Sequence, residues 1–176
     1  MLSRFSLLTI YKSFIRPHID YGDVVFDQSY NVTFHKKLES LQYSAALAIT
    51  GAIRGTSREK IYQELGLESL QQRRCYRKLT LFFKIHMKKY PSYLFNMIPK
   101  KEHTYQTRQR EDIPLFKAKH NFFQNSFFPS TIKEWNKIDC NIRKSETIDV
   151  YMVIILNIIS MIVSVHYVIA EEMLRI

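Results

Sequence analysis

Three aspartates near the N-terminus come closest to the spacing of a catalytic centre. Asp20, Asp23 and Asp27 lie three and four positions apart, so on a helix they would form a stripe of carboxylates. Two-metal chemistry needs neighbouring carboxylates that bridge both ions. In the string Tyr21-Gly22-Asp23-Val24, however, a valine follows the aspartate. The spacing therefore favours a solvated acidic face with local ion pairs over an active site.

The sequence contains no other arrangement typical of catalysis or metal binding. Cys75 and Cys140 lie far apart and form no CxxC motif. His86, His103 and His120 are evenly spaced, but they fall in a predicted helix, a polar loop and an extended segment. There is no Gly-rich phosphate loop, no GxSxG and no HExxH. We therefore predict no metal site, no cofactor, no small-molecule substrate and no enzymatic activity of the chain by itself.

The positive charge of the chain is concentrated in its central third. The formal net charge is +10, and residues 73–119 contain 13 Lys and Arg against Glu102, Glu111 and Asp112. Such a block attracts a polyanion, either nucleic acid or an anionic membrane surface, through counterion release and long-range steering. A solvated basic face that serves only solubility is the alternative.

Composition and apolar periodicity predict an all-α or mainly α fold. The chain has only four Gly and five Pro, too few for the turns of a many-stranded sheet protein. We expect a small bundle of about six helices in residues 1–145. The first helix should kink or end at Pro17. The second, from Thr33, should bury one apolar side and end at Gly51; that side comprises Phe34, Leu38, Leu41, Ala45, Ala48 and Ile49.

Two capping boxes predict the starts of the next helices. Thr56 with Glu59 should open a short helix that Gly66 ends, and Ser69 with Gln72 should open a longer helix that runs to about Tyr90. The exposed side of the longer helix should be cationic, with Arg73, Arg74, Arg77, Lys78, Lys84 and Lys88. The aromatic residues between Phe122 and Trp135 have helical spacing and are expected to form a small core rather than a base-stacking surface.

The C-terminal segment differs from the rest in its nearly uninterrupted apolar character. Residues 150–170 are long enough to cross a bilayer as a helix, and Lys137, Arg143 and Lys144 before them predict an intracellular main body. We therefore expect three regions: a helical region 1–98, a basic loop with short aromatic helices 99–145, and a hydrophobic tail 146–176. An alternative function follows, that of a small tail-anchored membrane protein with a basic cytosolic domain.

Three stretches together resemble one protein family. They are TIYKSFIRPHIDYGDVVFDQ, KLESLQYSAALAITGAIRGTSREKIYQELGLESLQQRRCYRKL and NSFFPSTIKEWNKID. In this order they are similar to the thumb and connecting region of non-LTR retrotransposon reverse transcriptases of the jockey type. The resemblance covers roughly residues 7–143 and stops where the apolar tail begins. We hypothesise that the tail is a product of reading past the original frame.

The resemblance implies a part of an RNA-directed DNA polymerase without its catalytic palm. The catalytic aspartates of that family precede the region seen here, and Asp23 matches a downstream segment rather than the catalytic turn. The family pattern further implies that Thr50, Gly51, Arg54, Gly55, Thr56 and Arg58 form a turn that meets a nucleic-acid backbone. The expected partners are RNA or an RNA/DNA duplex and the missing palm domain. The nucleic-acid-binding residues expected are Arg54, Arg58, Arg73, Arg74, Arg77 and Lys78.

Overall fold

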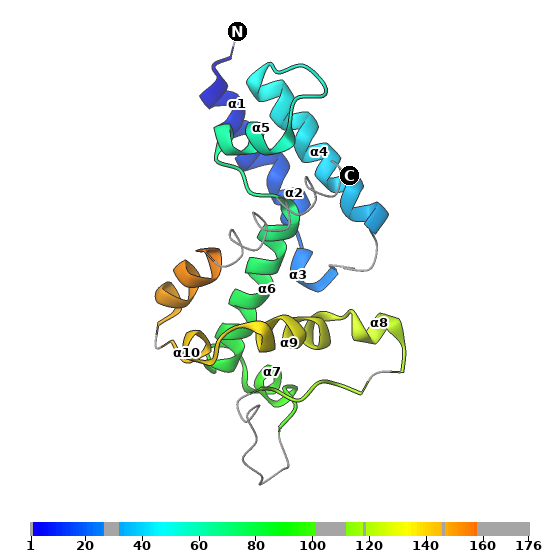
Figure 1. Cartoon of the computed structure of the whole chain (residues 1–176), viewed down its shortest axis with the longest axis vertical. Coiled ribbons are helices and arrows are strands. Elements are labelled where there is room, and N and C mark those ends of the chain that lie inside the picture. Colours follow the sequence, from blue (N-terminus) through cyan, green and yellow to red (C-terminus); the bar gives the residue numbers. More distant parts are fainter. Residues whose placement is uncertain (1, 27–31, 101–111, 118, 146, 158–176) are drawn as a thin grey trace, which may run out of the picture. The chain divides into compact units, whose positions relative to one another are not determined.

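The computed structural model describes residues 2–26, 32–100, 112–117, 119–145 and 147–157 (Figure 1). Within these ranges the chain is mainly helical and holds no β-strand, which confirms the predicted mainly α fold. The chain divides into two compact units, residues 1–74 and residues 75–176, and the boundary falls within helix α6 (Leu70–His86). Each unit has its own hydrophobic core.

The first unit is built around one long helix. Its elements are α1 (Arg4–Ile10), the π-helical segment η1 (Tyr11–Ile15), α2 (Arg16–Asp20), α3 (Asp23–Phe26), α4 (Val32–Thr50), α5 (Arg58–Leu65) and the first turn of α6. Helices α1 and α5 both pack on α4. The core between them consists of Tyr11, Ala46, Ile49, Ile61, Tyr62, Leu65 and Leu67.

The N-terminal helix continues through Pro17 instead of ending there. The Arg16 amide donates to the carbonyl of Tyr11, five residues earlier, which is the hydrogen bond of a π-turn. Proline has no amide hydrogen, and its ring crowds the carbonyl four residues before it. The wider turn accommodates that ring, and the chain stays helical to Asp20. Of the two outcomes predicted at Pro17, a kink or an end of the helix, the end is not observed.

Helix α4 ends at Thr50, and Gly51 follows with a φ of 72°, as predicted, but its buried side agrees only in part with the predicted one, since Ile49 is buried and Leu41 is not. Leu41 is 60% exposed, whereas Gln42 is only 2% exposed. The amide of Gln42 is satisfied on both sides, because its Oε1 accepts from the Tyr11 hydroxyl at 2.7 Å and its Nε2 donates to the carbonyl of Glu68 at 2.8 Å. These two partners allow a polar side chain to replace Leu41 in the core.

Replacing Tyr11 by phenylalanine should destabilise the first unit. Burial raises the pKa of Tyr11 to about 12, so its hydroxyl stays a donor at neutral pH. The variant leaves the buried Oε1 of Gln42 without this hydrogen bond, which costs roughly 1–3 kcal/mol. Urea denaturation followed by circular dichroism measures the change, and Tyr21→Phe, at an exposed tyrosine, is the control. Equal stability of the two variants would contradict the role of this hydrogen bond.

Of the local signals around α5 and the start of α6, two are confirmed and one is wrong. The Ser69 capping box is confirmed: the Gln72 amide donates to Ser69 Oγ, and Gln72 Oε1 accepts from the Ser69 amide. Gly66 ends α5 with a φ of 60°, also as predicted. The Thr56–Glu59 capping box is wrong, because the N-cap is Ser57 and the Thr56 hydroxyl bonds to the carbonyl of Ile53 instead.

The Gly66→Ala variant should lower the free energy of unfolding by about 1 kcal/mol, because a left-handed conformation is strained for alanine. An added Cβ at this position meets no atom within 4 Å, so the loss would come from the backbone alone. Gln63→Ala, at an exposed position of the same helix, controls for a change of helix propensity. If Gly66→Ala left the free energy of unfolding unchanged, residue 66 would not adopt the left-handed conformation.

The second unit surrounds a single tryptophan. It comprises the rest of α6, α7 (Ser92–Asn96), α8 (Asn121–Gln124), α9 (Phe127–Lys137) and α10 (Cys140–Arg143). Trp135 is 1% exposed and lies edge-on to Phe82, with ring centroids 5.0 Å apart. Helix α6 ends at His86 rather than near Tyr90, and Lys88 adopts a positive φ of 55°. The later part of the aromatic series, from Phe127 to Trp135, belongs to this core as expected, whereas Phe122 and Phe123 are exposed.

The beginning of the apolar C-terminal segment belongs to the core of the second unit. Residues 148–157 are helical, and Tyr151 and Ile155, one turn apart, are fully buried. The ring of Tyr151 stacks on Phe83 with centroids 4.2 Å apart and lies 5.8 Å from Trp135. The apolar pattern of the sequence instead predicts that Tyr151 and Ile155 belong to a separate hydrophobic tail, residues 146–176.

Among the residues described here, none of the helices combines the length and the apolar character that a bilayer crossing requires. Residues 158–170 of the predicted span lie outside the described ranges, so the span and the tail-anchored alternative stay predictions.

Candidate nucleic-acid interface

The six basic residues predicted to bind nucleic acid come from two elements. Arg54 and Arg58 belong to the turn between α4 and α5 and to the start of α5. The other four lie on consecutive turns of α6: Arg73, Arg74, Arg77 and Lys78. Arg77 and Lys78 fall in the second unit and the others in the first, so only the first four can be compared within one unit.

The turn from residue 51 to residue 57 is shaped by two glycines and one tyrosine. Gly51 and Gly55 have φ angles of 72° and 99°, which side-chain-bearing residues rarely adopt. The hydroxyl of Tyr43, on α4, donates to the carbonyl of Thr56 at 2.6 Å and holds the far end of the turn against the helix. We call this segment, together with Arg58, the arginine turn.

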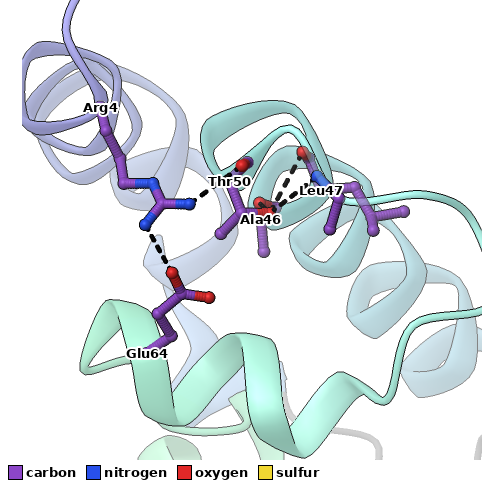
Figure 2. Close-up of polar contacts among 6 residues, drawn as sticks. Arg4, Ala46, Leu47, Thr50 and Glu64 are labelled. Atoms are coloured by element: carbon purple, nitrogen blue, oxygen red, sulfur yellow. Dashed lines mark hydrogen bonds and ion pairs between the residues drawn. The ribbon is translucent and has the colours of Figure 1, made fainter.

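Arg4 holds the start of the arginine turn, at the end of α4. Its guanidinium donates to the carbonyl of Thr50 at 3.0 Å and pairs with the carboxylate of Glu64 on α5 (Figure 2). The contact places a positive charge at the C-terminal end of α4, where the helix dipole favours one. One side chain thus ties α1, α4 and α5 together next to the turn.

Both arginines of this turn are exposed. The guanidinium of Arg58 lies 5.4 Å from the centre of the Tyr43 ring, a cation–π contact that orients the side chain without neutralising it. In the part of the chain that the structure describes, no acidic side chain pairs with Arg54 or Arg58. Two guanidinium groups on a braced turn can bind phosphate oxygens.

The arginines at the start of α6 are engaged within the first unit. Arg73 binds the carboxylate of Asp20 through Nε at 2.9 Å and Nη2 at 2.8 Å. Arg74 lies 2.6 Å from Nδ1 of His35 and is only 5% exposed. Lys78 is 8% exposed. The prediction of an exposed cationic side is therefore wrong for Arg74, which contacts His35, and for Lys78, which is buried as well.

The N-terminus of α6 could attract a phosphate, but a carboxylate of the chain itself, that of Glu39, already occupies it. Glu39 Oε2 accepts from the amide of Leu70 at 3.0 Å. Neither Glu39 nor Tyr43 was among the predicted site residues. A carboxylate or hydroxyl on a helix gives no signal of a partner 13 or 31 positions away. The geometry thus leaves the arginine turn as the exposed part of the predicted interface in the first unit.

Two of the three aspartates of the acidic stripe lie in the described residues. Asp20 is paired with Arg73 and Arg16, Asp23 is 6% exposed, and Asp27 lies outside the described residues. No group of three or more metal-ligating side chains occurs in the described parts of the chain.

Comparison with protein-family models, with curated proteins and with solved structures gave no match to this chain.

Proposed function

We propose that this chain is a fragment of an RNA-directed DNA polymerase of a mobile element. Residues 1–176 would correspond to the thumb and connecting region rather than to the catalytic palm, and their activity would be sequence-independent binding of RNA or an RNA/DNA duplex. The observation that carries the proposal is the arginine turn, with Arg54 and Arg58 exposed and the backbone held by Arg4 and Tyr43. The resemblance of three stretches to the thumb region of such enzymes supports the same conclusion.

Phosphate recognition explains why this binding would be indifferent to sequence. A guanidinium presents several N–H donors to phosphate oxygens, which are the same at every nucleotide. The braced turn reduces the conformational entropy that two arginines on a loop would lose on binding. The net charge of +10 adds long-range attraction. Arg73 and Arg74 contribute to this field, but direct phosphate contact would require them to leave Asp20 and His35.

Titration of the full chain with a fluorescent RNA/DNA hybrid tests the proposal. We expect binding at low ionic strength that weakens at least about tenfold between roughly 50 and 200 mM salt. Two hybrids of unrelated sequence should bind alike. The full chain is needed because Tyr151 and Ile155 belong to the core of the second unit. An absence of binding at low salt, or binding that salt does not affect, would refute the proposal.

The genomic sequence before the codon of Met1 tests the fragment hypothesis independently of binding. An F/Y-A-D-D turn encoded in the adjacent upstream sequence is the expected result. An upstream sequence with no such turn in any frame would contradict the assignment to a reverse transcriptase.

A further inference from the structure

The outward side of the N-terminal helix carries several large apolar side chains that are exposed. Segments α1, η1 and α2 follow one another without interruption from Arg4 to Asp20. Phe5 is 79% exposed and Phe14 is 68% exposed, and Ile10 and Ile15 are also exposed. The inward side carries Tyr11, which is fully buried in the core of the first unit. A helix with apolar residues on both sides commonly has a partner on both.

The polar side chains between the two phenylalanines are already hydrogen-bonded to the helix. Thr9 Oγ1 donates to the carbonyl of Phe5 at 2.9 Å, and Ser13 Oγ donates to the carbonyl of Thr9 at 2.7 Å. Because these hydroxyl hydrogens have partners within the helix, little hydrogen bonding is lost when this side leaves water. The outward side can therefore enter an apolar medium.

The charges exposed along this helix are positive. Lys12 is exposed between the phenylalanines, whereas Arg4, which is half-exposed, is paired with Glu64. The acidic residue of the helix, Asp20, is mostly buried and paired with Arg16 and Arg73. A second copy of the chain would bring the same positive charge to this side and be repelled, whereas an anionic surface would be attracted.

We propose that this helix binds the surface of anionic lipid bilayers, with Phe5 and Phe14 inserted below the headgroups and Lys12 among them. Aromatic insertion supplies the apolar part of the affinity, and Lys12 interacts with the negative surface potential. The orientation is parallel to the membrane plane. This binding requires neither the predicted span at residues 150–170 nor the arginine turn.

Tryptophan substitution in the full chain tests the insertion directly. Phe14→Trp should show a blue-shifted emission and quenching by brominated lipid with vesicles of phosphatidylcholine and phosphatidylserine, and a weaker response with phosphatidylcholine alone. Leu41→Trp is the matched control, because Leu41 is similarly exposed but belongs to another helix, α4. Trp135 is buried and contributes the same background to both. Equal quenching at residues 14 and 41 would overturn the proposal.

A loss-of-binding variant separates this helix from other routes to the membrane. Phe5→Ser/Phe14→Ser should lower the partition coefficient on anionic vesicles at least about tenfold, since each phenylalanine loses apolar burial. Because the variant keeps the apolar C-terminal segment, unchanged partitioning would contradict the proposal.

A further combination of variants distinguishes lipid binding from nucleic-acid binding. Adding Arg54→Gln/Arg58→Gln to the Phe14→Trp protein should leave its quenching by brominated lipid intact, so failure of the function proposed above would not affect this result. A Phe5→Ser/Phe14→Ser variant that loses binding to the hybrid but not to vesicles would assign this surface to nucleic acid and refute the lipid proposal.

Discussion

Replacing Tyr151 by alanine is expected to lower the free energy of unfolding of the second unit by about 3–5 kcal/mol. Tyr151 is fully buried, stacks on Phe83 and lies against Trp135. Removing its ring leaves a cavity at the centre of this core, which neighbouring side chains fill only partly. Chemical denaturation followed by the emission of Trp135, the single tryptophan of the chain, reports on this unit.

Two further tyrosine variants make this test specific. Tyr93→Ala removes the same ring from an exposed position on α7 and should change the stability little. Tyr151→Phe should be nearly neutral, because the buried hydroxyl of Tyr151 has no hydrogen-bond partner among the described residues. If Tyr151→Ala behaved like Tyr93→Ala, residues 148–157 would not be part of the core, and the segment would again be a separate tail.

The Arg54→Gln/Arg58→Gln variant is expected to weaken binding to an RNA/DNA hybrid at least about tenfold at low salt, because two charge-assisted phosphate contacts are lost. Neither side chain lies in a core, so the fold should be retained. The measurement is a fluorescence anisotropy titration of the full chain against one hybrid.

A charge-matched control separates contact from general attraction. Lys117→Gln/Lys133→Gln removes the same net charge from exposed positions of the second unit. It should weaken binding far less than the change at the arginine turn. If the two double variants lost the same amount of affinity, binding of the hybrid would depend on the net charge of the chain rather than on contacts with this turn.

Several features set by neighbouring residues were predictable from the sequence, although the Thr56–Glu59 capping box was not among them, whereas features set by distant residues were not predictable. The Ser69–Gln72 capping box and the glycine that ends α5 depend on a few adjacent residues, and the structure contains both. The burial of Gln42 depends on Tyr11 and Glu68, which lie 31 and 26 residues away. Helical periodicity alone predicts that Leu41, rather than Gln42, lies in the core.

The candidate site follows the same division. The sequence identified Arg54 and Arg58 and the glycines of their turn, but Asp20, the partner of Arg73, lies 53 residues away. Likewise, apolar character alone does not distinguish a membrane helix from a core helix. Residues 148–157 carry buried Tyr151 and Ile155 one turn apart, a pattern hidden within the longer apolar run.

The salt dependence of hybrid binding tests most directly whether the arginine turn contacts the phosphate backbone. The measurement is the slope of log binding constant against log salt concentration for the unmodified chain and for Arg54→Gln/Arg58→Gln. We predict a steep negative slope for the unmodified chain and a slope that is shallower by roughly 1.5–2 units in the variant, since each lost phosphate contact removes about 0.9 or slightly less. The same slope in both proteins would contradict a phosphate-binding role for this turn.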